Sequence, residues 1–315
     1  MTARRFLAAI AAAVLGACSA TPTAPPSPLD ARIWDVRAES FISEEQLALR
    51  LRQVRYRLLG EVHDHPAHHC LRAALIGQLA APGESVEVYF EQFDRAHDAA
   101  LREAQSAGAD ADALVRAGRI GRDWHWPLHR PLVAAALIAK YPVRAANLAD
   151  TETRRIAKAG ALGPQDAALA GVLATADWSA ARETALRAEI SESHCRALPE
   201  KLVPAMALAQ RSRDAALALA LSAAPGSAVL IAGNGHVRRD LGVLLYLPNG
   251  STALSVGFLE TRAEDADPRA YARGAAGDTA YDYIWFTAPH PRPDPCRAFW
   301  TRPAAHRPGT GIAPD

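Results

Sequence analysis

The sequence is poor in lysine, cysteine and aromatic residues, and it carries almost no net charge. Only three of its 35 basic residues are lysines, and 34 acidic residues leave a formal net charge of +1 over 315 residues. Nucleic-acid-binding domains depend on a basic surface, so we expect no nucleic-acid partner. Hydrophobic residues make up 50% of the chain, which is enough for a core and excludes a wholly disordered protein.

Four cysteines are too few and too widely spaced for the common cysteine-based metal and haem motifs. No CxxC pair and no CxxCH occurs, which leaves a zinc ribbon and a covalently attached c-type haem unsupported. Walker A, GxSxG and HExxH sequences are also absent. Disulfides form in exported proteins, and Cys195 and Cys296 are candidates for such a pair, which the sequence alone does not establish.

The N-terminus has the pattern of a secretory signal. Two arginines precede an apolar run at residues 6–15, which is too short to span a membrane as a helix. The sequence Leu-Gly-Ala-Cys ending at Cys18 matches the bacterial lipobox, in which the cysteine is lipidated. Residues 1–17 are therefore predicted to be a lipoprotein signal peptide, the alternative being an ordinary signal peptide with a chance cysteine.

Residues 18–30 are rich in serine, threonine, alanine and proline, a composition typical of a flexible tether. Ser19 stands where the signal for retention in the inner membrane usually has aspartate. We therefore expect the lipid on Cys18 to anchor the protein in the outer membrane of the bacterial cell envelope.

Short apolar segments alternate with helical patterns through residues 31–286. This alternation predicts a single α/β domain with a mostly parallel central sheet and many helices on both faces. The strands are expected at 56–59, 86–90, 143–146, 228–232, 241–247, 253–259 and 281–286. The helices are expected at 43–54, 66–79, 94–117, 130–140 and within 150–222. Seven prolines in residues 287–315 predict an extended or disordered tail.

Three predicted strands end in polar residues. Glu61 and His63 follow the first strand, Glu91 follows the second, and His236 follows the strand at 228–232. Ligands of open α/β sheets bind at the carboxyl ends of the strands, so we expect these four side chains to share one crevice. Two imidazoles and two carboxylates can hold a divalent metal or serve as an acid–base set. Each histidine belongs to a Gly-x-x-His sequence.

Two other groups of polar residues are interpreted as solvated side chains without a ligand. We interpret His65, His68 and His69, at the start of a predicted helix, as solvated side chains rather than ligands. Gln210 and Asp214 share one face of a predicted helix, which is typical of a solvated stripe.

The segment 124–129 is unusual because it contains two tryptophans and two histidines in a chain with 6% aromatic residues. The indoles of Trp124 and Trp126 can stack on a flat apolar ligand, although core packing is the usual role of tryptophan.

Four blocks of sequence between residues 56 and 260 together resemble a known family. They are Leu58-Leu59-Gly60-Glu61-Val62-His63, Tyr89-Phe90-Glu91-Gln92-Phe93, Ala209-Gln210-Arg211-Ser212-Arg213-Asp214 and Gly233-Asn234-Gly235-His236-Val237. In this order they resemble the ChaN family of haem-binding lipoproteins, within the wider Tiki, TraB and erythromycin-esterase-like superfamily. The resemblance implies non-covalent haem held between two subunits of a homodimer. It also implies a role in haem or iron uptake, with an outer-membrane receptor as a further partner.

The resemblance implies a tyrosine as the ligand of the haem iron, shortly after a tryptophan. The corresponding segment here places His129 after Trp126, and histidine also ligates haem iron. We therefore expect His129 as the axial ligand, with Tyr141 and Tyr246 as alternatives. Trp124 and Trp126 would form the wall of the site. The haem propionates would meet arginines, namely Arg119, Arg122 and Arg130. Arg213 is a further expected haem-binding residue, since Arg213 or Arg211 could meet an anionic ligand.

Two functions follow from these patterns. The first is an outer-membrane haem-binding lipoprotein. The alternative is a metal-dependent hydrolase, as in the Tiki branch, in which Glu61, His63, Glu91 and His236 hold a divalent metal or activate water. A structural lipoprotein with a vestigial site is the third possibility. We expect haem on the aromatic segment and the metal in a separate polar crevice.

Overall fold

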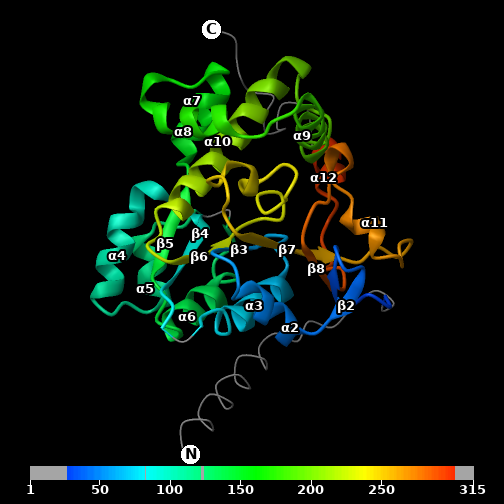
Figure 1. Ribbon diagram of the computed structural model, residues 1–315. Helices are drawn as coiled ribbons and strands as arrows, with labels where there is room; N and C mark the ends of the chain where they lie inside the picture. The colour runs from blue at the N-terminus through cyan, green and yellow to red at the C-terminus, as the bar shows by residue number, and fades with distance from the viewer. Residues whose placement is uncertain (1–26, 82, 122–123, 302–315) are drawn as a thin grey trace, which may run out of the picture.

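The computed structural model describes residues 27–81, 83–121 and 124–301. Its centre is an eight-stranded sheet with the order β2-β1-β8-β7-β3-β6-β4-β5 (Figure 1). The strands are β1 (Ile33–Asp35), β2 (Ser40–Ile42), β3 (Tyr56–Leu59), β4 (Val86–Asp94), β5 (Val143–Asn147), β6 (Ser227–Ile231), β7 (Ala253–Glu260) and β8 (Tyr283–Thr287). From β8 to β5 the neighbours are parallel, whereas β1 is antiparallel to both β2 and β8. The predicted mostly parallel sheet is confirmed.

Helices cover both faces of this sheet (Figure 1). The helices on one face are α2 (Glu44–Leu51), α3 (Pro66–Ile76), α4 (Asp98–Ser106), α5 (Ala111–Ala117) and α6 (Arg130–Ile138). The helices on the other face are α7 (Asp150–Ala159), α8 (Ala167–Thr175) and α10 (Val203–Ser222), and α9 (Ala180–Ser193) packs against α10. The shorter helices are α11 (Arg269–Ala272) and α12 (Pro295–Thr301).

The alternation of side chains along each strand divides the core into two layers. In β6, Leu230 packs in the layer of α10, whereas Val229 and Ile231 pack in the layer of α3. All three side chains are fully buried, and burying each contributes about 1.5–3 kcal/mol. An apolar strand of this kind is stable only between two helical layers, which is what its sequence predicts.

The helix beginning after Ser43 follows its predicted capping pattern. The Ser43 hydroxyl accepts a hydrogen bond from the Gln46 amide at 3.2 Å, and the Gln46 side chain accepts one from the Ser43 amide at 2.9 Å. This reciprocal pair satisfies two of the amides that the first turn leaves without partners.

Two details of the sequence-based assignment are wrong. Residues 241–247 contain the 3₁₀ helix η5 (Val243–Tyr246) and no strand. The neighbouring β7 is already paired on both edges by β3 and β8, so no free edge remains for another strand there. The predicted helix at 94–117 is divided into α4 and α5, because Asp110 caps a new helix by accepting from the Ala113 amide at 2.8 Å.

Of the extended or disordered tail predicted at 287–315, residues 288–294 are ordered without helix or strand, and residues 295–301 form the helix α12. Arg292 pairs with Glu260 at 2.7 Å and with Asp64 at 2.9 Å, and a disulfide joins Cys296 to Cys195. Prolines keep residues 288–294 out of the sheet, but ion pairs and the disulfide order the segment nevertheless.

Several predictions lie outside the described residues, namely the signal peptide 1–17, Cys18, most of the tether and residues 302–315. Within the described ranges, no helix is both long and apolar enough to cross a membrane.

Candidate functional site

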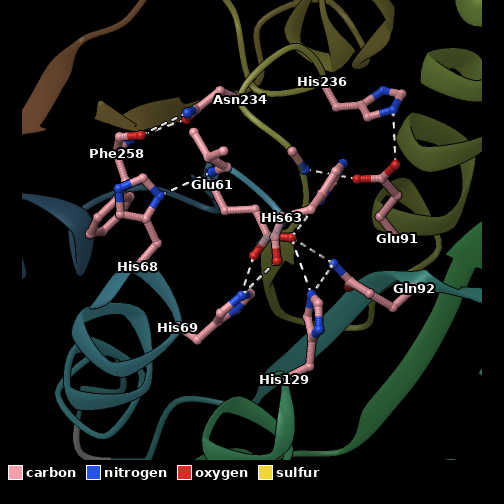
Figure 2. A network of polar contacts seen from close by, with 12 residues as sticks. Glu61, His63, His68, His69, Glu91, Gln92, His129, Asn234, His236 and Phe258 are labelled. Carbon is pink, nitrogen blue, oxygen red and sulfur yellow. Dashed lines mark hydrogen bonds and ion pairs between the residues drawn. The ribbon is translucent and has the colours of Figure 1, made fainter. Parts of the chain in front are cut away.

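The carboxyl ends of β3, β4 and β6 meet at one edge of the sheet, and the polar residues that follow them meet there too (Figure 2). The backbone amide of Asn234 donates to the carbonyl of Glu61 at 2.8 Å, which joins the loop after β6 to the loop after β3. The Gly233 amide donates to the Glu91 carboxylate at 2.8 Å. The structure thus brings together the ends of all three strands, as the sequence predicts.

The Glu61 carboxylate is the centre of this site (Figure 2). It is only 2% exposed, and five side chains surround it. They are His63 (Nδ1 to Oε1, 2.7 Å), Gln92 (Nε2 to Oε1, 3.1 Å), His129 (Nε2 to Oε1, 3.2 Å), His69 (Nδ1 to Oε2, 3.2 Å) and the Arg72 guanidinium, which forms an ion pair with Oε2. A buried carboxylate needs such partners because its desolvation is otherwise very costly.

Three of these five partners come from α3 and from the start of α6. His69 and Arg72 lie three residues apart on the buried face of α3, so both reach the same carboxylate. His129 precedes the first residue of α6, which packs against α3. Gln92 lies on β4, directly after Glu91.

His63 stands at the mouth of the site. Its side chain is 45% exposed, and its Nδ1 is held by Glu61, while no described residue forms a hydrogen bond with its Nε2. The Trp124 ring meets it edge to face, with 4.8 Å between ring centroids. Burial lowers the pKa of His63, so the imidazole is neutral at neutral pH and its Nε2 carries a lone pair.

Glu91 belongs to a second, charged cluster behind the first. His236 lies between two carboxylates, with Nε2 3.1 Å from Glu91 and Nδ1 2.6 Å from Asp214. Burial alone would lower the pKa of His236, but these two charges outweigh it and raise the pKa to about 10. Arg213 adds a further ion pair to Glu91 at 2.9 Å.

This second cluster changes the prediction for a metal. Both ring nitrogens of His236 donate to carboxylates, so the imidazolium has no lone pair for a metal and cannot act as a base. Glu61, His63, Glu91 and His236 therefore lie at one edge without forming one ligand set. Among the described residues, the group with the spacing of a metal site is Glu61, His69 and His129, whose ligand atoms lie within 4.8 Å of one another.

The expected haem residues are placed differently from the prediction. His129 is 1% exposed and faces Glu61, so it cannot ligate a haem that binds at the surface. Trp124 is half-buried against His63. Trp126 is also half-buried and packs against the core layer that contains α3 and α6. The aromatic segment therefore lies directly against the polar crevice, because Trp124 contacts His63.

Two of the arginines that were expected near the haem already form ion pairs with carboxylates. Arg213 pairs with Glu91, and Arg130 forms an exposed ion pair with Asp112 at 3.2 Å. Arg119 is exposed, and Arg122 lies outside the described residues.

Two interpretations of polar residues on helices are also wrong. His65, His68 and His69 are between 0 and 4% exposed rather than solvated, and Asp214 is 2% exposed. His68 accepts from the Val62 amide at 3.0 Å and contacts the Thr287 hydroxyl at 2.8 Å, which fixes the loop that carries His63. Apolar neighbours on the same helical faces are the sequence signal that these side chains point inward.

The two alternative tyrosines are buried. Tyr141 is 9% exposed, and burial raises its pKa. Tyr246 lines an open cavity of about 890 Å³, but its hydroxyl accepts a hydrogen bond from Arg211 Nε at 3.1 Å and burial raises its pKa as well. A tyrosine ligates iron as the phenolate, which a raised pKa disfavours.

Comparisons with known proteins agree with this architecture. A family model described as haem-binding uptake, Tiki superfamily, ChaN, matches residues 47–247. No curated protein matches the chain. Among solved structures, the chain is similar to ChaN of Campylobacter jejuni, described as showing cofacial haem binding, with 22% identity over 83% of this chain and 98% of that one and a TM-score of 0.66.

More distant similarities involve the type III effector HopBA1 and an erythromycin esterase EreC variant in its open conformation. HopBA1 shares 14% identity over 85% of this chain and 100% of its own, with a TM-score of 0.37. EreC shares 13% identity over 73% and 76%, with a TM-score of 0.39. Likeness at this level carries no functional weight.

Proposed function

This chain belongs to the ChaN family of haem-binding uptake proteins in the Tiki superfamily, and we propose that it binds haem as its cargo with His63 Nε2 as the iron ligand. The observation that carries the proposal is the open, neutral Nε2 of a half-exposed imidazole whose Nδ1 is held by a buried carboxylate. Metal-ligating histidines have this arrangement, because the carboxylate fixes the tautomer and raises the basicity of the ligand nitrogen.

The surroundings of His63 fit a flat apolar ligand with a central metal. Trp124 provides an aromatic wall beside the imidazole. His125, exposed on the same loop, offers a further polar contact at the rim. The other candidates fit less well, since His129 is buried in the Glu61 network and the phenols of Tyr141 and Tyr246 have raised pKa values.

Haem titration tests the ligand. Ferric haem added to the purified protein should give a Soret band of imidazole-ligated iron. His63→Ala should weaken haem binding by at least about 100-fold, since loss of an outer-shell partner alone costs 10–100-fold. His194→Ala, which changes an exposed histidine at the end of α9, is the control and should bind as the wild type does. Unchanged affinity in His63→Ala, or a phenolate-to-iron charge-transfer band, would contradict the proposed ligand.

Anchoring of this haem-binding domain in the outer membrane is a further part of the proposal. It rests on the sequence before the domain, where Cys18 ends a lipobox. Lipid on that cysteine would hold the domain at the envelope, where an outer-membrane receptor could exchange haem or iron with it. Replacing Cys18 with alanine should release the protein into the soluble periplasmic fraction. Continued membrane association of that variant would contradict the anchor.

We also propose that haem joins two copies of the chain. The description of Campylobacter jejuni ChaN as binding haem cofacially supports this, because His63 lies at a surface where a second copy could face it. Sedimentation of the purified domain should show a monomer without haem and a dimer with it. A mass that haem does not change would contradict this part of the proposal.

A further inference from the structure

Behind His63, the side chains of Glu61, His69 and His129 form an enclosed cluster. Each is at most 2% exposed, and their ligand atoms lie within 4.8 Å of one another. They come from three different elements, namely the loop after β3, the helix α3 and the residue before α6. The cluster therefore depends on the folded chain and is absent from any single segment.

The tautomer of His69 follows from its backbone contact. Its Nε2 lies 2.9 Å from the carbonyl oxygen of His63, which can only accept, so Nε2 carries the proton. The lone pair is then on Nδ1, which faces Glu61 Oε2 at 3.2 Å.

His129 contributes the second imidazole. Its Nε2 lies 3.2 Å from Glu61 Oε1, a carboxylate oxygen that can only accept, whereas its buried Nδ1 has no hydrogen-bond partner among the described residues. Nε2 therefore carries the proton and donates to Glu61, and it becomes a metal ligand when that proton moves to Nδ1. A cation among the three side chains would neutralise the charge of the buried carboxylate.

In the chain without metal, Arg72 supplies part of that positive charge. Its guanidinium pairs with Glu61, and Nη2 lies 3.1 Å from His69 Nδ1. Its other nitrogens donate to the carbonyls of Leu59 and His68, each at 3.3 Å, so the side chain is also held independently of Glu61. The buried Oε1 of Gln92, beside the same carboxylate, has no hydrogen-bond partner among the described residues.

We propose that Glu61, His69 and His129 bind a first-row divalent metal ion, with the Arg72 guanidinium occupying its place when the metal is absent. Two imidazoles and one carboxylate form a ligand set suited to Zn²⁺ and to non-haem Fe²⁺. The contact of His69 Nε2 with a backbone carbonyl is the outer-shell bond that orients metal-ligating histidines. This site is distinct from the haem ligand, because His63 contributes none of its three donors.

The probe is Co²⁺, which reports nitrogen and oxygen ligands in its visible spectrum. Chelator-treated, haem-free protein should bind one Co²⁺ per chain. His69→Gln and His129→Gln should each weaken binding by at least about 100-fold, more than an outer-shell change would. The matched control is His194→Gln, which removes an exposed histidine far along the chain and should bind as the wild type does.

Arg72→Gln gives a prediction of opposite sign. Removing the competing cation should tighten Co²⁺ binding by about tenfold, which corresponds to about 1.4 kcal/mol.

A readout on the unaltered chain guards against variants that fail to fold. Proton NMR of the Co²⁺ form should show paramagnetically shifted N–H signals from two imidazoles, one of them, His69 Nε2–H, protected from exchange by its carbonyl acceptor. Absence of stoichiometric binding to the wild type, or the absence of these shifted imidazole signals, would overturn the proposal. Because the haem is left out, failure here leaves the haem titration of His63→Ala unaffected.

Discussion

Gly233 is the position where adding one methyl group tests the role of His63 without removing any functional group. A Cβ at Gly233 would lie 2.8 Å from His63 Cε1 and 3.0 Å from its Nε2. Restoring an ordinary contact of at least 3.4 Å requires the ring to move by about 0.6 Å, away from its alignment with Glu61 and Trp124. A hydrogen bond to a charged group contributes about 1.5–3 kcal/mol, so its loss should weaken haem binding by about 10–100-fold.

Gly235→Ala is the matched control, because a Cβ there would meet only Glu189 at 3.8 Å, an ordinary contact. Both variants should be compared by haem titration and by urea unfolding. Since His63 is half-exposed and can move, Gly233→Ala should cost only about 1 kcal/mol of stability. Equal haem affinity in the two alanine variants would refute the role given to the His63 position. A loss of affinity matched by loss of folding would refute it too.

Three further predictions concern the charged cluster and the disulfide. The pKa of His236 is raised to about 10, so the stabilisation by its charged form is complete below about pH 6.5 and is lost as the pH rises toward 10. Urea unfolding should show the free energy of unfolding declining across this range. His236→Gln should abolish this pH dependence. Asp214→Asn should lower the free energy of unfolding by about 3–5 kcal/mol because it leaves the imidazolium partly unpaired, whereas Asp177→Asn, which breaks an exposed pair with Arg182, should cost under about 1 kcal/mol. Cys195 and Cys296 close a loop of 101 residues, so replacing both with serine should lower the free energy of unfolding by up to about 4 kcal/mol, and an unchanged urea midpoint would contradict this.

The parts of the fold that the sequence predicts are those with a strong local pattern. Strands β3, β4, β5 and β6 are mostly buried and contain several apolar residues each, and each lies within a residue of its expected position or, for β4, extends beyond it. The three-residue strands β1 and β2 carry no such pattern, and they exist because β8 offers a free edge. Residues 241–247 are as apolar as a strand, yet the edges of β7 are already taken.

The candidate site also has a part that the sequence predicts and a part that it does not. The rule that ligands bind at the carboxyl ends of parallel strands locates Glu61, Glu91 and the two Gly-x-x-His loops, since it needs only the ends of the strands. It says nothing of side chains that helices bring to the same edge. His69 and Asp214 are such residues, and both are buried although their sequence pattern predicts solvated positions.

What separates a buried polar side chain from a solvated one is its partner, and the partners here are far apart in the sequence. Glu61 and His129 are 68 residues apart, and Asp214 and His236 are 22 residues apart. A polar residue on an apolar helical face is costly to bury alone, by several kcal/mol for a charge, so its burial requires a complementary group elsewhere. The histidines and acids on the inward faces of α3 and α10 can therefore be buried only because they pair with polar residues at the ends of the strands. These pairings distinguish the two imidazoles of the Gly-x-x-His loops. His236 lies between two carboxylates and stabilises the cluster as a cation, whereas His63 is held by one carboxylate and keeps the lone pair that the proposed iron ligand needs.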